Sequence, residues 1–197
     1  DLKINLQTKK AYVTLIRDNL ILVIDVKTDK VLKIISLENY GDLGSPRKIT
    51  IDKEDNRIYF TYFYQDKESL KYIGGIGIID GNSDSIIDNM EFEGGANRLI
   101  VDKNTKNIFT FFENTKEFVI IDPYQKKIIQ KIDFENKFPV DFKFHNDRLY
   151  VLTTNIEDSS RKILVMDVND AKIISILDVE NQANSIMIDS KTGRLFV

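Results

Sequence analysis

A repeat of 43 to 50 residues, two turn signals in each repeat and strand-like runs that are apolar on both sides together predict an all-β fold. Four-stranded antiparallel units that repeat at this length are typical of a β-propeller. Each repeat opens with an apolar–polar pair, a polar turn, and then an aliphatic residue followed by an aromatic one. The polar residue of the opening pair, called the turn mark below, is followed by the turn; in the five copies it is Asn5, Asp52, Asp102, His145 and Asp189. In four copies the mark lies six residues before the aliphatic residue, and the copy at His145 is two residues shorter.

A second phrase alternates with the first and doubles the number of turns in each repeat. An aspartate is followed six residues later by an aliphatic residue, at Asp25, Asp80, Asp122 and Asp167. Each repeat therefore contains two β-hairpins, or four short strands. In the second repeat we expect strands at 48–51, 57–62, 76–79 and 85–92. No window has a 3.6-residue apolar period long enough for a helix of about 10 residues.

The third strand of several repeats is a continuous apolar run, as in 20–24, 118–121 and 163–166. A strand that is apolar on both sides needs cover on both faces, which radially stacked blades provide. We expect one partial propeller domain with blades at 1–46, 47–96, 97–140 and 141–184, and the first hairpin of a fifth blade at 185–197. Because propellers have about 4–8 blades, we expect the chain to belong to a larger ring of about seven. The alternatives are a four-bladed ring with a protruding or re-paired fifth hairpin, and a two-fold pair of arcs.

Composition excludes several kinds of partner and site. Lys plus Arg is 28 and Asp plus Glu is 31, which leaves a net charge of −3 and predicts no nucleic-acid partner. The apolar runs are far shorter than the roughly 20 residues of a membrane span, so we expect no membrane insertion. The chain has no cysteine and one histidine, which excludes thiolate metal sites, Cys nucleophiles and most His-based zinc sites.

Three phrases carry a resemblance to a known family: residues 10–14 (KAYVT), 57–61 (RIYFT) and 148–151 (RLYV). They are similar to the YVTN repeat, named for its tyrosine, valine, threonine and asparagine, of surface-layer and lactonase-like β-propellers. The resemblance covers the whole chain. It implies a propeller fold and a place outside the cytoplasm, in the periplasm or on the cell surface. Members of this family include surface-layer and envelope proteins and partner-binding propellers, with relatives among sugar lactonases and quinone-dependent enzymes.

The recurring aspartates are expected to be structural, because a turn aspartate accepts hydrogen bonds from the backbone of its own turn. One stretch, 80–91, also spaces its oxygens as a calcium loop does, which makes Asp80, Asn82, Asp84 and Glu91 weak calcium candidates. Ser85 stands where that loop requires glycine, and the flanks are strand-like, so we expect no metal site. We also predict no cofactor and no catalytic constellation. The glycines at 74–77 lack the spacing of a phosphate-binding loop and are expected to allow close approach of neighbouring backbone.

Two long connections, 38–46 and 62–75, are expected on one face of the second blade. Tyrosine with polar neighbours suits a protein-binding surface, since it gives contact area with few rotatable bonds. The candidate binding residues are Tyr40, Asp42, Tyr62, Tyr64, Lys67, Lys71 and Tyr72. The alternative is that these tyrosines only cover the blade edge. By analogy with propellers, we expect the residues that open successive first strands to line a channel mouth, namely Arg47, Arg98, Asp141 and Asn184.

The favoured function is a non-catalytic binding module or scaffold for a protein or another envelope component. One alternative is a piece of a propeller enzyme, lactonase-like or quinone-dependent, whose active site lies in further blades. The other is a structural cell-surface repeat protein. The sequence leaves the partner and the oligomeric state open.

Overall fold

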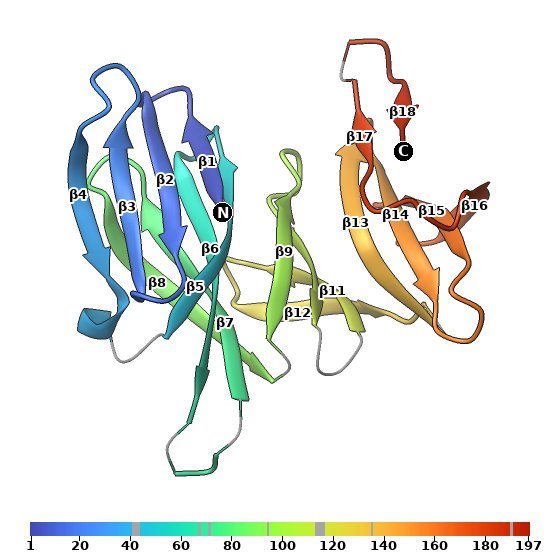
Figure 1. The fold of residues 1–197 in the computed structure, drawn as a ribbon, viewed down its shortest axis with the longest axis horizontal. Helices are drawn as coiled ribbons and strands as arrows, with labels where there is room; N and C mark the ends of the chain where they lie inside the picture. Colours follow the sequence, from blue (N-terminus) through green and yellow to red (C-terminus); the bar gives the residue numbers. More distant parts are fainter. Residues whose placement is uncertain are drawn as a thin grey trace. The chain divides into compact units, whose positions relative to one another are not determined.

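The structure is a computed structural model that describes residues 1–40, 44–66, 68–70, 72–93, 95–112, 117–134, 136–189 and 191–197. Apart from one turn of 3-10 helix, η1 (Leu37–Tyr40), every regular element among these residues is a β-strand. The strands form four four-stranded antiparallel sheets and one two-stranded hairpin, and each sheet follows chain order (Figure 1). The all-β prediction of four complete blades and the opening hairpin of a fifth is confirmed.

The strand bounds are as follows. The first blade holds β1 (Leu2–Asn5), β2 (Lys10–Leu15), β3 (Leu20–Asp25) and β4 (Val31–Ser36). The second holds β5 (Ser45–Asp52), β6 (Arg57–Gln65), β7 (Tyr72–Asp80) and β8 (Ser85–Glu93). The third holds β9 (Ala96–Val101), β10 (Ile108–Phe112), β11 (Glu117–Asp122) and β12 (Lys127–Ile132). The fourth holds β13 (Lys137–His145), β14 (Arg148–Asn155), β15 (Arg161–Asp167) and β16 (Ile173–Val179), and β17 (Met187–Ile188) pairs with β18 (Leu195–Phe196).

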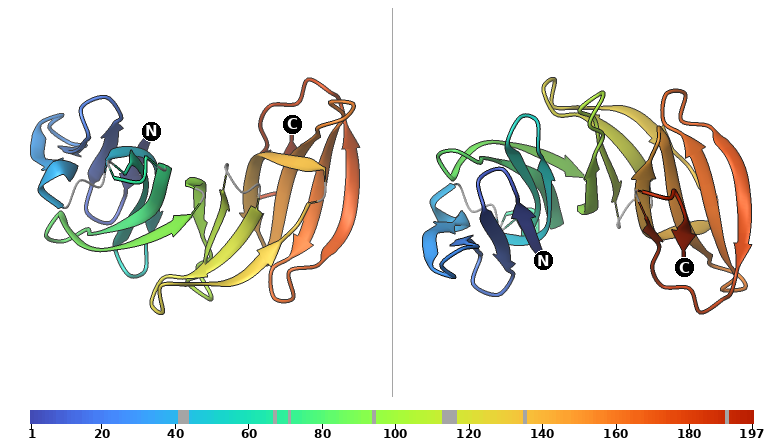
Figure 2. Two further views of the ribbon diagram at one scale, coloured as in Figure 1. Left: turned by 90° about the horizontal axis from the view of Figure 1, so that it is seen from below. Right: turned by 90° about the horizontal axis from the view of Figure 1, so that it is seen from above.

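The chain divides into two compact units. Residues 1–131 contain the first three blades, and residues 132–197 contain the fourth blade and the β17–β18 hairpin. In the second unit, β13 to β16 form one twisted sheet, and β17 lies against β13 (Figure 2). Among the described residues, no helix is long and apolar enough to cross a membrane.

The recurring aspartates organise the turns as predicted. Asp25 accepts hydrogen bonds from the backbone N–H groups of Lys27 and Thr28, at 2.7 and 3.0 Å. The other turn aspartates each accept one or two backbone N–H groups of their own turn; they are Asp52, Asp80, Asp102, Asp122, Asp167 and Asp189. The fourth residue after the mark has a positive φ, as at Asp29 (57°) and Asp84 (52°). The copy at His145 is shorter because Asn146 and Asp147 both have positive φ and close a two-residue hairpin.

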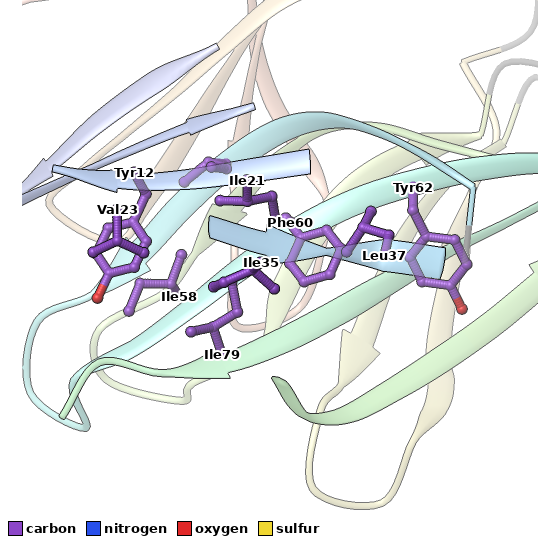
Figure 3. Close-up of a cluster of buried hydrophobic side chains, with 10 residues drawn as sticks. Tyr12, Ile21, Val23, Ile35, Leu37, Ile58, Phe60, Tyr62 and Ile79 are labelled. Carbon is purple, nitrogen blue, oxygen red and sulfur yellow. The ribbon is translucent and has the colours of Figure 1, made fainter. Parts of the chain in front are cut away.

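Blades pack face to face through apolar side chains, which explains the strands that are apolar on both sides. Tyr12, Ile21, Val23, Ile35 and Leu37 of the first blade meet Ile58, Phe60, Tyr62 and Ile79 of the second (Figure 3). These nine side chains are buried, and each contributes on the order of 1.5–3 kcal/mol by leaving water. The opposite side of the second blade, including Tyr59 and Ile78, packs on Leu99, Ile108 and Val119 of the third blade.

Glycines in β7 make room for aromatic rings of β6. Gly77 is paired with Phe60 and Gly75 with Tyr62 across the two strands. A Cβ atom at Gly77 would lie 2.1 Å from the Phe60 ring, and one at Gly75 would lie 2.3 Å from the Tyr62 ring. Gly74 also approaches Gly95, at the start of the third blade, since its Cβ would lie 2.3 Å from the Gly95 Cα. The close approach predicted for these glycines is therefore observed, but the partners are mainly rings within the same blade.

Candidate binding surface on the second blade

The β6–β7 hairpin is longer than the sequence predicted. The predicted strands end at residue 62 and restart at 76, with a loop between them. In the structure both strands are nine residues long, and pairing continues to Gln65 and Tyr72. The prediction of a long loop was wrong because the glycines and aromatics of this stretch pair across the hairpin, as described above. The result is a two-stranded arm that projects beyond the rest of the blade (Figure 1).

The tip of this arm is held by local hydrogen bonds. Asp66 accepts hydrogen bonds from the backbone N–H and the hydroxyl of Ser69, both at 2.6 Å. These bonds, led by the one from the hydroxyl, lower the pKa of Asp66. The Gln65 side-chain amide donates to the Leu70 carbonyl at 3.0 Å. Leu70 has a φ of +57°, and its side chain is 68% exposed.

The two tyrosines at the base of the arm have different environments. Tyr62 is fully buried, donates to the Met90 carbonyl at 3.4 Å and accepts from the Asn89 amide at 3.1 Å. Its assignment to an exposed binding surface was therefore wrong, because its ring lies over Gly75 in the interface with the first blade. Tyr64 stacks on Tyr62 with ring centroids 6.5 Å apart, is half-buried, and donates to Glu91 Oε1 at 3.2 Å. Burial and then Glu91 raise the pKa of Tyr64.

The remaining predicted binding residues are not described in full. Asp42, Lys67 and Lys71 lie outside the described residues, as do the side chains of Tyr40 and Tyr72. The backbone of Tyr40 ends η1, and that of Tyr72 begins β7.

The connection between the first two blades reaches the base of the same arm. Ser45 pairs with Phe63, and a Cβ atom at Gly44 would lie 2.6 Å from the Tyr64 Cβ. Arg47, an exposed residue of β5, places its guanidinium 5.0 Å from the centre of the Phe63 ring, a cation–π arrangement. The two elaborated connections therefore lie side by side at the second blade.

The four predicted channel-mouth residues divide between the two units. Arg47 and Arg98 belong to the first unit, and Arg98 is a bulged residue of β9 with a φ of +55°. Asn184 of the second unit is exposed and lines an open cleft with Val179 and Val197. The channel mouth stays a prediction for Arg47, Arg98 and Asn184, because these residues belong to different units.

Asp141 has a structural role that the sequence analysis missed. It is only 3% exposed, and its carboxylate accepts the Ile186 N–H at 3.1 Å and the Phe142 N–H at 2.9 Å. It thus fastens the β17–β18 hairpin to the fourth blade rather than facing a channel. Asp1 does the same for the first pair of blades, since it accepts the Ile49 N–H at 3.1 Å. Both acids lie four residues before the turn mark, a spacing that could have revealed the pattern.

The calcium candidates are engaged elsewhere. Asp84 accepts from Lys10 Nζ at 2.7 Å and from the Tyr12 hydroxyl at 2.6 Å, and Glu91 accepts from Tyr64. Asp80 accepts from Ser83 within its own turn, which lowers the pKa of Asp80. In the part of the chain that the structure describes, no three His, Asp or Glu side chains are grouped closely enough to hold a metal ion.

A second cluster of acidic residues lies at the interface between the second and third blades. Lys106 Nζ lies 2.7 Å from Glu54, 3.2 Å from Asp52 and 3.9 Å from Asp55. Asp55 also accepts from the Tyr124 hydroxyl at 2.5 Å. One ammonium and one hydroxyl of the third blade thus bind the acidic turn of the second. We assign this cluster to blade packing.

Comparison with solved structures identifies the architecture. Kuenenia stuttgartiensis hydrazine synthase matches with a TM-score of 0.72 at 10% identity, over 91% of this chain and 48% of that chain. The Cps50 (Swd1) β-propeller domain of Myceliophteria thermophila matches with a TM-score of 0.73 at 10% identity, over 98% and 60%. The Dos1 propeller matches with a TM-score of 0.72 at 11% identity, over 97% and 50%. The fold is a β-propeller.

At these identities the likeness shows the fold alone. This chain spans about half the length of the solved structures that it matches. No family model and no curated protein matches the chain. The resemblance to the YVTN repeat therefore remains a hypothesis.

Proposed function

We propose that this chain is part of a non-catalytic β-propeller that binds a protein partner through the tip of the β6–β7 arm. The observation that carries the proposal is Leu70. A leucine at a φ of +57° is strained, and at 68% exposure it gains almost no packing. Because burial of the side chain does not offset this backbone strain, we infer that leucine has a functional role at this position.

The arm has the features of a binding element. Apolar residues on loops held by a rigid scaffold are typical of recognition surfaces. The Asp66 and Gln65 hydrogen bonds hold Ser69 and Leu70 before a partner arrives, so little conformational entropy of these two residues is lost on binding. Tyr64 and Glu91 at the base add a polar rim. We infer a partner with an apolar pocket for Leu70.

The place of action is part of the proposal. The resemblance to surface-layer and envelope propellers supports a location outside the cytoplasm, in the periplasm or on the cell surface. Fractionation of the source cells, with an antibody to this chain, tests it. Recovery with the cytoplasmic fraction would exclude the envelope partner but not the arm as a binding element.

The enzyme alternative rests on a different observation. Hydrazine synthase and the dihydro-heme d1 dehydrogenase NirN, which matches with a TM-score of 0.65, are enzymes that share this fold. On that alternative, catalytic or cofactor-binding residues lie in further blades, and replacing Leu70 leaves activity unchanged. The alternative of a cell-surface array protein predicts further repeats or an anchor.

Cross-linking at the tip tests the proposal. A photo-reactive amino acid at position 70 should capture one partner in source cells, and Leu70→Asp should then abolish binding of that purified partner. Ile156→Asp is the matched control, because Ile156 is 51% exposed in the corresponding connection of the fourth blade. Equal affinity of Leu70→Asp and the unchanged protein would overturn the proposal.

A further inference from the structure

The first blade has an apolar face that no other blade covers among the described residues of its unit. Leu2, Val13, Leu22 and Ile34 are paired in one row across β1 to β4 and point to the side away from the second blade. Leu2 is 51% and Ile34 59% exposed. Such a sheet face is too apolar to be left in water without a functional reason.

The corresponding face of the second blade shows what such a surface binds. Leu2 and Ile49 occupy the same repeat position, three residues before the turn marks Asn5 and Asp52. Ile49 is 2% exposed because the first blade packs on it, in the same cluster as Tyr12 and Ile35. One repeat position is thus buried where a preceding blade is present and open where none is.

A polar group marks the same face. Asp29 and Asp84 are the fourth residues after the turn marks Asp25 and Asp80, and both have positive φ. The carboxylate of Asp84 accepts hydrogen bonds from Lys10 and Tyr12 of the preceding blade. Asp29 is exposed, and none of the described residues donates to its carboxylate. Asp29 is therefore an acceptor in the position that a preceding blade would use.

We propose that this face binds a further blade of the same polypeptide, with a Lys or Arg of that blade on Asp29 and its apolar side on Leu2, Val13, Leu22 and Ile34. The second strand of that blade presents the cation two residues before an aromatic residue. Lys10 and Tyr12, and Arg148 and Tyr150, show this spacing within the chain. The greater length of the matched propellers is consistent with a further blade.

A second copy of the chain is the competing occupant. The β17–β18 hairpin also carries an arginine, Arg194, two residues before an aromatic, Phe196. A copy that docked this hairpin on Asp29 would cover part of the same face. The two occupants differ in one respect, since only a second copy is lost on dilution.

Cysteine labelling distinguishes the outcomes, because the chain contains no cysteine of its own. Ile34→Cys and Ile156→Cys are made singly in the polypeptide as its source produces it. Both side chains are more than half exposed in residues 1–197. We expect maleimide to label position 34 at least about tenfold more slowly than position 156 at every protein concentration, since labelling at position 34 would require local opening of the interface.

Three results would overturn the proposal. Equal labelling at positions 34 and 156 would mean that nothing covers the face. Protection of position 34 that disappears on dilution would mean a second copy. A source polypeptide of 22.8 kDa, the mass of these 197 residues, would leave no further blade. Asp29→Lys should speed labelling at position 34, whereas Asp18→Lys, an exposed aspartate in the β2–β3 turn, should not; equal rates in the two variants would remove the role of Asp29.

Discussion

Tyr12 donates a hydrogen bond to the carboxylate of Asp84 across the first blade interface, and the two oxygen atoms lie 2.6 Å apart. Lys10 Nζ binds the other carboxylate oxygen at 2.7 Å. The contact joins the second strand of one blade to the strand 3–4 turn of the next. Burial first, and then the hydrogen bond to Asp84, raise the pKa of Tyr12. A charge-assisted bond at the edge of an apolar interface fixes the register of the two blades.

Asp84→Ala should destabilise the protein by about 2–3 kcal/mol, because it leaves the hydroxyl of Tyr12 without an acceptor and the largely buried ammonium of Lys10 with the Gly81 carbonyl but no counter-charge. Asp29→Ala is the matched control, since Asp29 has the same place in its turn and nearly the same φ. In residues 1–197 it should change stability by less than about 0.5 kcal/mol. Urea unfolding measures both variants, and equal losses would show that the turn, not the interface contact, determines the effect.

Gly77→Ala should destabilise the second blade by roughly 2–4 kcal/mol, because the added Cβ would lie 2.1 Å from the Phe60 ring. Phe60→Leu also costs stability by removing the ring from the interface. If the clash is the cause, the double variant should be more stable than the sum of the two single losses predicts. Thermal unfolding of the four proteins completes the cycle, and strict additivity would contradict this explanation.

Alkaline solution should weaken the fold through Tyr62. Burial is the largest cause that raises the pKa of Tyr62 above its usual value of 10.0, so above that pH the folded chain binds more protons than the unfolded chain. The contribution of Tyr62 to stability is therefore complete below about pH 10 and decreases as the pH rises further. Tyr62→Phe should flatten the fall in urea midpoint above about pH 10. The half-buried Tyr64→Phe should flatten it less, and an equal effect would argue against burial as the cause.

The turns and blade repeats were predictable from the sequence because both are local. A turn aspartate accepts hydrogen bonds from N–H groups two and three residues later in the chain. The turns at Asp25 and Asp122 can therefore be predicted from the few residues that form them. The continuous apolar runs indicated burial on both faces of the strand for a similar reason, because such a run can be recognised without knowing which strand lies beside it.

The arm and the Asp141 contact were missed because their causes are not local. Gly75 reads as a loop residue until Tyr62, thirteen positions earlier, is placed across from it. Asp141 reads as a surface acid until Ile186, 45 positions later, donates to it. Long-range pairing decides both positions. For Asp141 the sequence holds one signal, the position four residues before the turn mark that it shares with Asp1, but this spacing does not identify the partner.

Leu70→Gly should stabilise the protein by up to about 1 kcal/mol, because glycine adopts a φ of +57° without the strain that leucine carries there. The same change should weaken binding of the partner captured at position 70. Ile156→Gly is the control, since Ile156 has no positive φ and glycine there should be neutral or destabilising. Urea unfolding and a binding titration are both required. A Leu70→Gly protein that is less stable than the unchanged chain would remove the strain on which the proposed function rests.

Asp141→Ala should loosen the β17–β18 hairpin while the first unit stays folded. The Ile186 N–H would lose its acceptor in a buried position, at a cost of roughly 1–3 kcal/mol. Within its unit the hairpin packs on the fourth blade through Ile186 and Leu195. The loss of this hydrogen bond should therefore lower the free energy of local opening of the hairpin. Amide hydrogen exchange should accelerate in residues 186–196 and stay unchanged in β2 and β6. Asp178→Ala is the control, since Asp178 forms only an exposed ion pair with Lys162; unchanged exchange in the Asp141 variant would show that apolar packing alone holds the hairpin.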